Sequence, residues 1–190
     1  MDSLPLKRGG RFLRVGKPDW SDPLDLSYNR NSGGRWNPPN NFGALYLNGD
    51  KATASANARR FFADNGGFSI HDLKPESRPI AVVCEVAPLE LTDALTVDGL
   101  RALGLSDSYP WKVGWDSCQP IGKAAREAGS LGVVARSAAE CDGPGKSVGE
   151  ELALFEPLQG VVEIERSVFE DWYRERLTAA PPPLPHPSGL

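Results

Sequence analysis

The stretch GGRWNPPNNFGALYL, residues 33–47, places an arginine and a tryptophan between a glycine pair and a proline pair, and then runs into a short apolar segment. Glycine permits tight turns and proline fixes φ, so we expect Arg35 to lie on a loop with few accessible conformations. A guanidinium held in this way loses little entropy when it binds a phosphate. The stretch equally fits a structural loop in which Trp36 anchors the core and Arg35 caps a carbonyl.

Composition limits the classes of protein to which the chain can belong. It has 190 residues, 40% of them hydrophobic, which fits one globular domain, and its net charge of −4 argues against a nucleic-acid partner. The three cysteines and two histidines lack the spacing of a zinc site or a disulfide framework, so we expect no metal. No apolar run approaches the roughly 18 residues of a membrane span, and no secretory signal is evident. We therefore expect a cytoplasmic protein without a membrane segment.

Short strand-like runs alternate with a few helical segments, which indicates an α+β domain with a sheet of about six strands. An alanine-rich segment, residues 51–64, contains no helix breaker and is expected to be helical. The predicted strands are residues 11–15, 44–47, 80–87, 132–135, 151–155 and 160–165.

Two further helices are predicted from their end signals. Asp116 or Ser117 is expected to cap a helix that has Pro120 in its first turn and ends at Gly129. Ser167 and Glu170 have the spacing of a capping box, which predicts an amphipathic helix over residues 168–177.

These signals also predict the domain limits. We expect a lead at residues 1–10, one domain over residues 11–178, and a mobile proline-rich tail at residues 179–190.

The chain contains four blocks in this order: RFLRVG at 11–16, GGRWNPPNNFGALYL at 33–47, GWDSCQPIG at 114–122 and GVVARSA at 132–138. Together they resemble the RES domain over about residues 11–158. RES proteins are toxins of bacterial toxin–antitoxin pairs that destroy NAD by hydrolysis or phosphorolysis. The resemblance implies an ADP-ribosyltransferase-like fold of mixed or antiparallel sheets with flanking helices, NAD as substrate, and an antitoxin as partner. It leaves open whether the chain forms a homo-oligomer.

The resemblance also assigns a binding site for NAD. Arg14 and Arg35 match the two arginines of the family, which would hold the pyrophosphate through bidentate hydrogen bonds. Tyr46 matches a tyrosine whose ring would line the pocket for the nicotinamide ribose. By its own pattern, Tyr46 also fits a strand residue that fills the core.

The chain departs from the family at the residues that would perform the chemistry. Eleven residues after the tyrosine the family has a glutamate, whereas this chain has Asn57. Loss of nicotinamide leaves positive charge on the sugar, which a carboxylate stabilises and an asparagine does not. The family serine aligns with Asp116, next to Ser117. Asp116 could supply the missing carboxylate or act as a general base, while Asn57 forms a hydrogen bond with a ribose hydroxyl or with the nicotinamide amide. Alternatively, Asp116 could only cap its helix.

The sequence therefore predicts an NAD glycohydrolase or phosphorylase with Asn57, Asp116 and Ser117 as catalytic candidates. One alternative is a RES fold that binds NAD or another nucleotide without turnover, and another is an ADP-ribosyltransferase. We also expect Trp36 and Trp115 to be largely buried, near the cleft that separates the strand carrying Tyr46 from the helix after Ser117.

Overall fold

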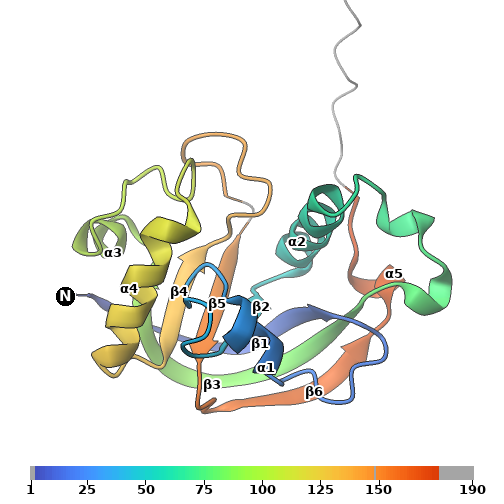
Figure 1. Ribbon diagram of the computed structural model, residues 1–190, viewed down its shortest axis with the longest axis horizontal. Coiled ribbons are helices and arrows are strands. Elements are labelled where there is room, and N and C mark those ends of the chain that lie inside the picture. The colour runs from blue at the N-terminus through green and yellow to red at the C-terminus, as the bar shows by residue number, and fades with distance from the viewer. Residues whose placement is uncertain (1–2, 148, 176–190) are drawn as a thin grey trace, which may run out of the picture.

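One long strand forms the centre of the sheet, and it begins at Ile80 in a run rich in β-branched residues. The computed structural model describes residues 3–147 and 149–175, and within them it contains six strands (Figure 1). The strands are β1 (Pro5–Gly16), β2 (Ala44–Asn48), β3 (Ile80–Ala94), β4 (Gly132–Arg136), β5 (Glu150–Phe155) and β6 (Val161–Ser167).

Strand β3 joins the two halves of the sheet. It pairs antiparallel with β1 over nearly its whole length, with β6 near its start and, in parallel, with β4 near its end. Strand β5 lies between β4 and β2 and is antiparallel to both. One residue pair, Leu13 with Asn48, links β2 back to β1, so that five of the strands form a closed ring. This mixed sheet with flanking helices confirms the predicted α+β class, and all six predicted strands are present.

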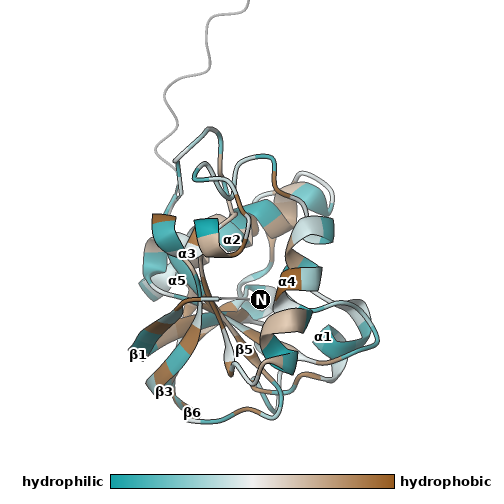
Figure 2. Cartoon of the chain, turned by 90° about the vertical axis from the view of Figure 1, so that its left-hand side faces the viewer, coloured by the Kyte–Doolittle hydropathy of each residue, from teal (hydrophilic) through white to brown (hydrophobic). Residues whose placement is uncertain are grey.

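The ring has an apolar interior. Strand β5 is largely hydrophobic in Figure 2, whereas β1, β3 and β6 alternate between hydrophilic and hydrophobic residues, as expected of strands with one face toward solvent. The interior cluster includes Phe12, Leu45, Leu47, Val82 and Leu152. The outer face of β2, β5 and β4 is covered by helices instead.

Two longer helices pack on this side of the sheet, and Figure 1 shows them on either side of β2 and β5. One, α4 (Trp115–Glu127), packs over β4 and β5, and the other, α2 (Lys51–Asp64), packs over β1 and β2. Helix α2 has the predicted bounds, because Asp50 caps it by accepting a hydrogen bond from the Thr53 N–H at 2.7 Å. Within the described residues, no helix is long and apolar enough to cross a membrane. The other helices are α1 (Ser27–Ser32), α3 (Val97–Ala102) and α5 (Phe169–Trp172), with 3₁₀ turns at Ile70–Asp72 and Pro75–Ser77.

The start of α4 differs from the prediction. The helix begins at Trp115 with Gly114 as its N-cap, so neither Asp116 nor Ser117 is the cap and Pro120 lies in the second turn. Trp115 projects from this exposed first turn and is 48% exposed, so the expectation that it is buried is wrong, whereas Trp36 is buried as expected. The other end matches: Gly129, at φ 88°, closes a Schellman motif in which the Ser130 N–H donates to the Ala125 carbonyl at 3.0 Å.

The two ends of the domain also differ from the prediction. Strand β1 begins at Pro5, so residues 5–10 of the predicted lead belong to the sheet. The predicted capping box is absent, because Ser167 is the last residue of β6 and Val168, which has no capping side chain, is the N-cap of α5. Helix α5 ends after four residues because Tyr173 is extended. The predicted proline-rich tail lies outside the described residues.

We predict that Gly122→Ala destabilises the protein by about 1–3 kcal/mol, the usual cost of overpacking a core. A Cβ at Gly122 would overlap the carbonyl oxygen of Trp36, so α4 and the loop would have to separate. Helix propensity alone predicts the opposite sign, since alanine is favoured over glycine by about 1 kcal/mol. Urea denaturation measures the change, with Gly143→Ala as a control at a loop position that has room for a methyl group. Unchanged or increased stability of Gly122→Ala would show that the contact is loose.

Candidate functional site

The glycine–arginine–tryptophan loop is anchored to β2 by the hydroxyl of Tyr46. This hydroxyl accepts a hydrogen bond from the Trp36 N–H at 2.8 Å and donates one to Asn37 Oδ1 at 3.0 Å. A Cβ at Gly34 would lie 2.6 Å from the same hydroxyl, so only glycine lets the ring approach the loop. Trp36 itself is 2% exposed. These contacts therefore hold the middle of the loop against β2.

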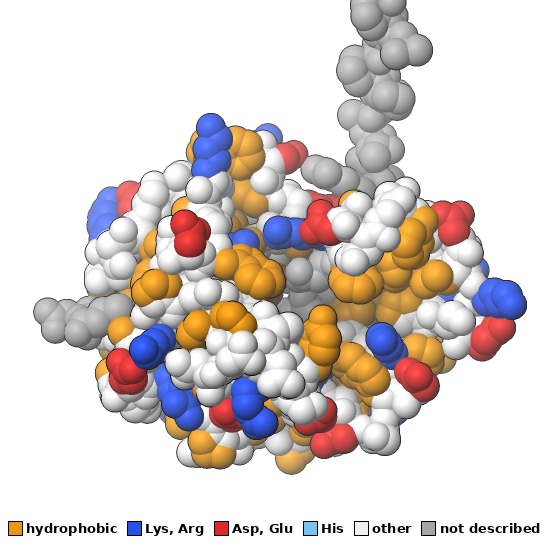
Figure 3. All heavy atoms as spheres, viewed as in Figure 1, with side chains coloured by type: hydrophobic (Ala, Val, Ile, Leu, Met, Phe, Trp, Pro, Cys, Tyr) orange, Lys and Arg blue, Asp and Glu red, His pale blue; other side chains and the backbone are white. Residues whose placement is uncertain are grey.

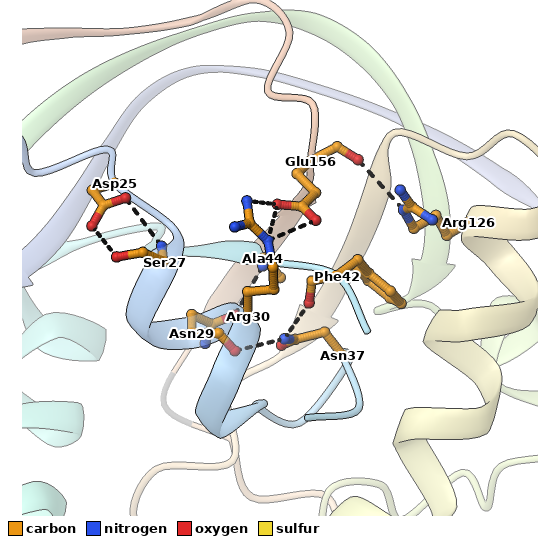
Figure 4. A network of polar contacts seen from close by, with 9 residues as sticks. All are labelled: Asp25, Ser27, Asn29, Arg30, Asn37, Phe42, Ala44, Arg126 and Glu156. Atoms are coloured by element: carbon orange, nitrogen blue, oxygen red, sulfur yellow. Dashed lines mark hydrogen bonds and ion pairs between the residues drawn. The ribbon is translucent and has the colours of Figure 1, made fainter. Parts of the chain in front are cut away.

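A second polar network holds the far end of the loop, as Figure 4 shows. The Asn37 side-chain amide donates to the carbonyls of Asn29 at 3.2 Å and Phe42 at 2.9 Å. Arg30 forms an ion pair with Glu156 at 2.6 Å, which ties α1 to the end of β5. Together these contacts leave the loop little freedom.

Arg35 extends from the fixed loop toward the start of α4. Its Nη1 donates to the Val113 carbonyl at 2.8 Å and lies 3.8 Å from Cys118 Sγ. Gln119 fastens the same turn by donating to the Gly34 carbonyl at 3.0 Å. Arg35 thus caps a carbonyl, as one of the two interpretations of the stretch expects, and its guanidinium also borders a cleft.

This cleft lies between α2, the segment before α4 and the loop after β4, where Figure 3 shows the surface hollowed. Its volume is about 480 Å³. Arg35, Arg60 and Lys112 contribute positive charge to its lining, whereas Glu140 contributes a negative charge that is paired with Arg59 at 2.6 Å. We call it the cationic cleft, because this balance favours an anionic ligand.

Arg60 reaches the cleft from α2. Its Nη1 donates to the Ala138 carbonyl at 2.9 Å, and its Nε lies 3.5 Å from the exposed carboxylate of Asp64. The pair with Asp64 joins two exposed side chains one helical turn apart, so it neutralises little of the charge of Arg60.

A cluster of polar side chains lies beside the cleft on the outer face of β2 and β5. Asn57, on α2, donates to Asn48 Oδ1 at 2.8 Å and to Glu151 Oε1 at 2.6 Å. Ser137 donates to the same Glu151 oxygen at 2.5 Å, and the next residue, Ala138, lines the cleft. A carboxylate is thus in contact with the residue that occupies the slot of the family glutamate.

Glu151 is absent from the site predicted from the sequence. The only sequence signal for it is a charged residue at the start of an otherwise apolar strand. The register between β2 and β5 brings Glu151 to the site. Asn48 pairs with Glu151 and Tyr46 pairs with Ala153, so these residues share one face of the sheet.

Arg14 does not join Arg35. Because Leu13 pairs with Asn48, Leu13 shares the face that carries Tyr46, and Arg14 points into the ring. There its guanidinium donates to the Pro23 carbonyl and lies 4.9 Å from the centre of the Trp20 ring. Burial lowers the pKa of Arg14 below its ordinary value. The two arginines therefore lie on opposite faces of the sheet, and the structure does not form the predicted pair.

The remaining predicted residues occupy different surroundings. The Tyr46 hydroxyl is committed to the loop, and its burial raises the pKa of Tyr46 well above the ordinary value of 10.0. Asp116 and Ser117 are exposed in the first turn of α4, next to Gly114, which lines the cleft. Asn57 lies on α2, and within the described residues no hydrogen bond or ion pair connects it to Asp116.

Comparison with known proteins agrees with this architecture. The model of the RES domain matches residues 11–173. A chain in the crystal structure of the M. tuberculosis MbcT–MbcA toxin–antitoxin complex has a similar fold, with a TM-score of 0.67 and 22% sequence identity. The match covers 84% of this chain and 86% of that one. No curated protein matches the sequence.

We predict that Tyr46→Phe destabilises the protein by about 1–3 kcal/mol at neutral pH, because it leaves the Trp36 N–H and Asn37 Oδ1 without their partner. Chemical denaturation measures the loss. Tyr28→Phe is the matched control, since Tyr28 is 80% exposed. Equal stability of Tyr46→Phe and wild type would contradict the anchoring role.

The same tyrosine predicts a pH dependence. In the unfolded chain Tyr46 ionises near pH 10, whereas in the folded protein its raised pKa keeps the phenol protonated at higher pH. The contribution of the protonated Tyr46 to the free energy of unfolding is therefore complete below pH 10 and is lost as the pH rises above that value. Tyr109, whose pKa burial also raises, acts in the same direction. The stability difference between wild type and Tyr46→Phe should shrink above pH 10, and a constant difference would contradict this linkage.

Proposed function

This chain belongs to the RES domain family, and from that membership and the cationic cleft we propose that it binds NAD and cleaves the bond between nicotinamide and ribose. The acceptor is water or phosphate. The observation that carries the proposal is the cleft itself, which Arg35, Arg60 and Lys112 line, beside the polar cluster that contains Glu151.

The cleft suits the most highly charged part of NAD. Its volume of about 480 Å³ is in the usual range of small-molecule sites. The pyrophosphate carries two negative charges, and guanidinium groups bind such oxygens with strong, directional hydrogen bonds. We assign Arg35 and Arg60 to the pyrophosphate, with Arg60 taking the place that the sequence gives to Arg14.

The family also supports a cellular role. The MbcT–MbcA structure is that of a toxin–antitoxin complex. By analogy, this chain would be a toxin that depletes NAD in the cytoplasm and is inhibited by an antitoxin protein. The shared fold supports this role.

A second candidate is an NAD-binding protein without turnover. Asn57 favours it, because an amide occupies the slot of the family glutamate and is engaged by Asn48 and Glu151. Incubation of the pure protein with NAD, with and without phosphate, separates the two candidates. The enzyme releases nicotinamide together with ADP-ribose or its phosphate ester. Binding of NAD without release of nicotinamide would favour the second candidate.

We predict that Arg35→Ala weakens NAD binding by about 1.5–3 kcal/mol, the range for hydrogen bonds to charged groups. Arg60→Ala should cost less, about 0.5–1.5 kcal/mol, because its side chain is 43% exposed and solvent screens its charge. Calorimetry measures both values. Arg166→Ala is the matched control, since Arg166 is a comparably exposed arginine that pairs with an acid on its own element, away from the cleft. A folded Arg35→Ala variant with wild-type affinity would remove Arg35 from the site.

A further inference from the structure

We propose that Glu151 is the carboxylate that stabilises the cationic sugar as nicotinamide leaves, in place of the glutamate that Asn57 replaces. This inference rests on the proposed cleavage of NAD. It assigns a catalytic role to a strand residue that lies 94 positions from Asn57 in the sequence.

The position of the Glu151 carboxylate is well defined. Its Oε1 accepts two hydrogen bonds, from Asn57 at 2.6 Å and from Ser137 at 2.5 Å, and Ser137 is fully buried. Both donors are neutral, so they orient the carboxylate without cancelling its charge. A carboxylate held in this way is preorganised to stabilise a positive charge that develops later.

The charge of Glu151 is also uncompensated. Within residues 3–147 and 149–175, neighbouring acids are paired: Glu140 with Arg59, Glu150 with Arg8 and Glu156 with Arg30. In the same part of the chain, no ion pair involves Glu151, and its Oε2 accepts no hydrogen bond. A carboxylate that forms no ion pair within the described residues is available to a cationic group of the substrate.

Asn57 and Glu151 form a complementary pair. A glutamate at position 57 would bring a second carboxylate against Glu151, and two like charges at that distance cannot both ionise readily. The side-chain amide of an asparagine can instead donate a hydrogen bond to Glu151. In this chain, therefore, the carboxylate of the site is provided by Glu151 on β5 and not by residue 57 on α2.

The location suits the sugar end of the substrate. Asn57 and Arg60 are three residues apart on α2 and therefore neighbours on its surface. Arg60 contacts Ala138 at the cleft, and Ser137, the preceding residue, contacts Glu151. The pyrophosphate at Arg35 and Arg60 would thus direct the ribose toward Glu151.

The reaction requires no covalent bond to Glu151. The bond between ribose C1 and the nicotinamide nitrogen breaks, and its electron pair leaves with nicotinamide, which becomes neutral. The sugar then carries the positive charge, and Glu151 stays ionised beside it. A water oxygen bonds to C1 and releases one proton to solvent, or a phosphate oxygen bonds to C1 instead. Asp116 is less suited to this role, because it is exposed and solvent screens its charge.

Binding of a charged analogue tests the assignment without relying on turnover. The probe is ADP linked to a protonated pyrrolidine in place of the terminal ribose, compared by calorimetry with ADP-ribose. Wild type should prefer the cationic probe by about tenfold or more, whereas Glu151→Gln should reduce this preference to near onefold. The glutamine oxygen can still accept from Asn57 and Ser137, so the variant should fold. Glu165→Gln, at an exposed position on β6 outside the cleft lining, is the control and should keep the preference.

The outcomes separate this inference from the proposed function. If wild type cleaves NAD, Glu151→Gln should slow cleavage by roughly a hundredfold with little change in NAD affinity. Equal cleavage by Glu151→Gln would overturn the role of Glu151 and leave the proposed function intact. A wild type that prefers the cationic probe through Glu151 but cleaves no NAD would refute the proposed function and with it the catalytic role of Glu151, which would then only bind a cationic group. A wild type without the preference, or a Glu151→Gln variant that keeps it, would refute the inference.

Discussion

The hydrogen bond from the Trp36 N–H to the Tyr46 hydroxyl, at 2.8 Å, is the contact on which the candidate site depends. It joins a loop to a strand of the sheet, and it forms because Gly34 lets the ring approach the loop backbone. Gly122 lets α4 pack against the other side of Trp36. Arg35, between these contacts, points toward the start of α4, where it borders the cationic cleft.

Charge is distributed unevenly around this cleft. Arginines and a lysine lie in its lining, the acid Glu140 of the lining is paired with Arg59, and the Glu151 carboxylate lies beside the cleft without an ion pair among the described residues. This arrangement matches a substrate that is anionic at its pyrophosphate and becomes cationic at its sugar. Asn57 connects the two regions, since it belongs to the same helix as Arg60 and donates to Glu151.

Local patterns predict the six strands and α2 well, because strand alternation and helix propensity depend on near neighbours, whereas the predicted caps of α4 and α5 are wrong. The bounds of α2 follow from its uninterrupted alanine-rich segment and the Asp50 cap. The site is harder to predict, because it depends on register. A shift of one residue between β1 and β2 would bring Arg14 to the face of Tyr46, and nothing in the sequence specifies that Leu13 pairs with Asn48. Glu151 is missed for the same reason, since its contact with Asn57 spans 94 residues.

The most direct test of this account is a crystal structure of the protein with ADP-ribose. The account predicts that the pyrophosphate lies within hydrogen-bond distance of the Arg35 and Arg60 guanidinium groups, with the terminal ribose facing the Glu151 carboxylate. A pyrophosphate bound at Arg14, inside the ring, or anywhere on the opposite face of the sheet would contradict it.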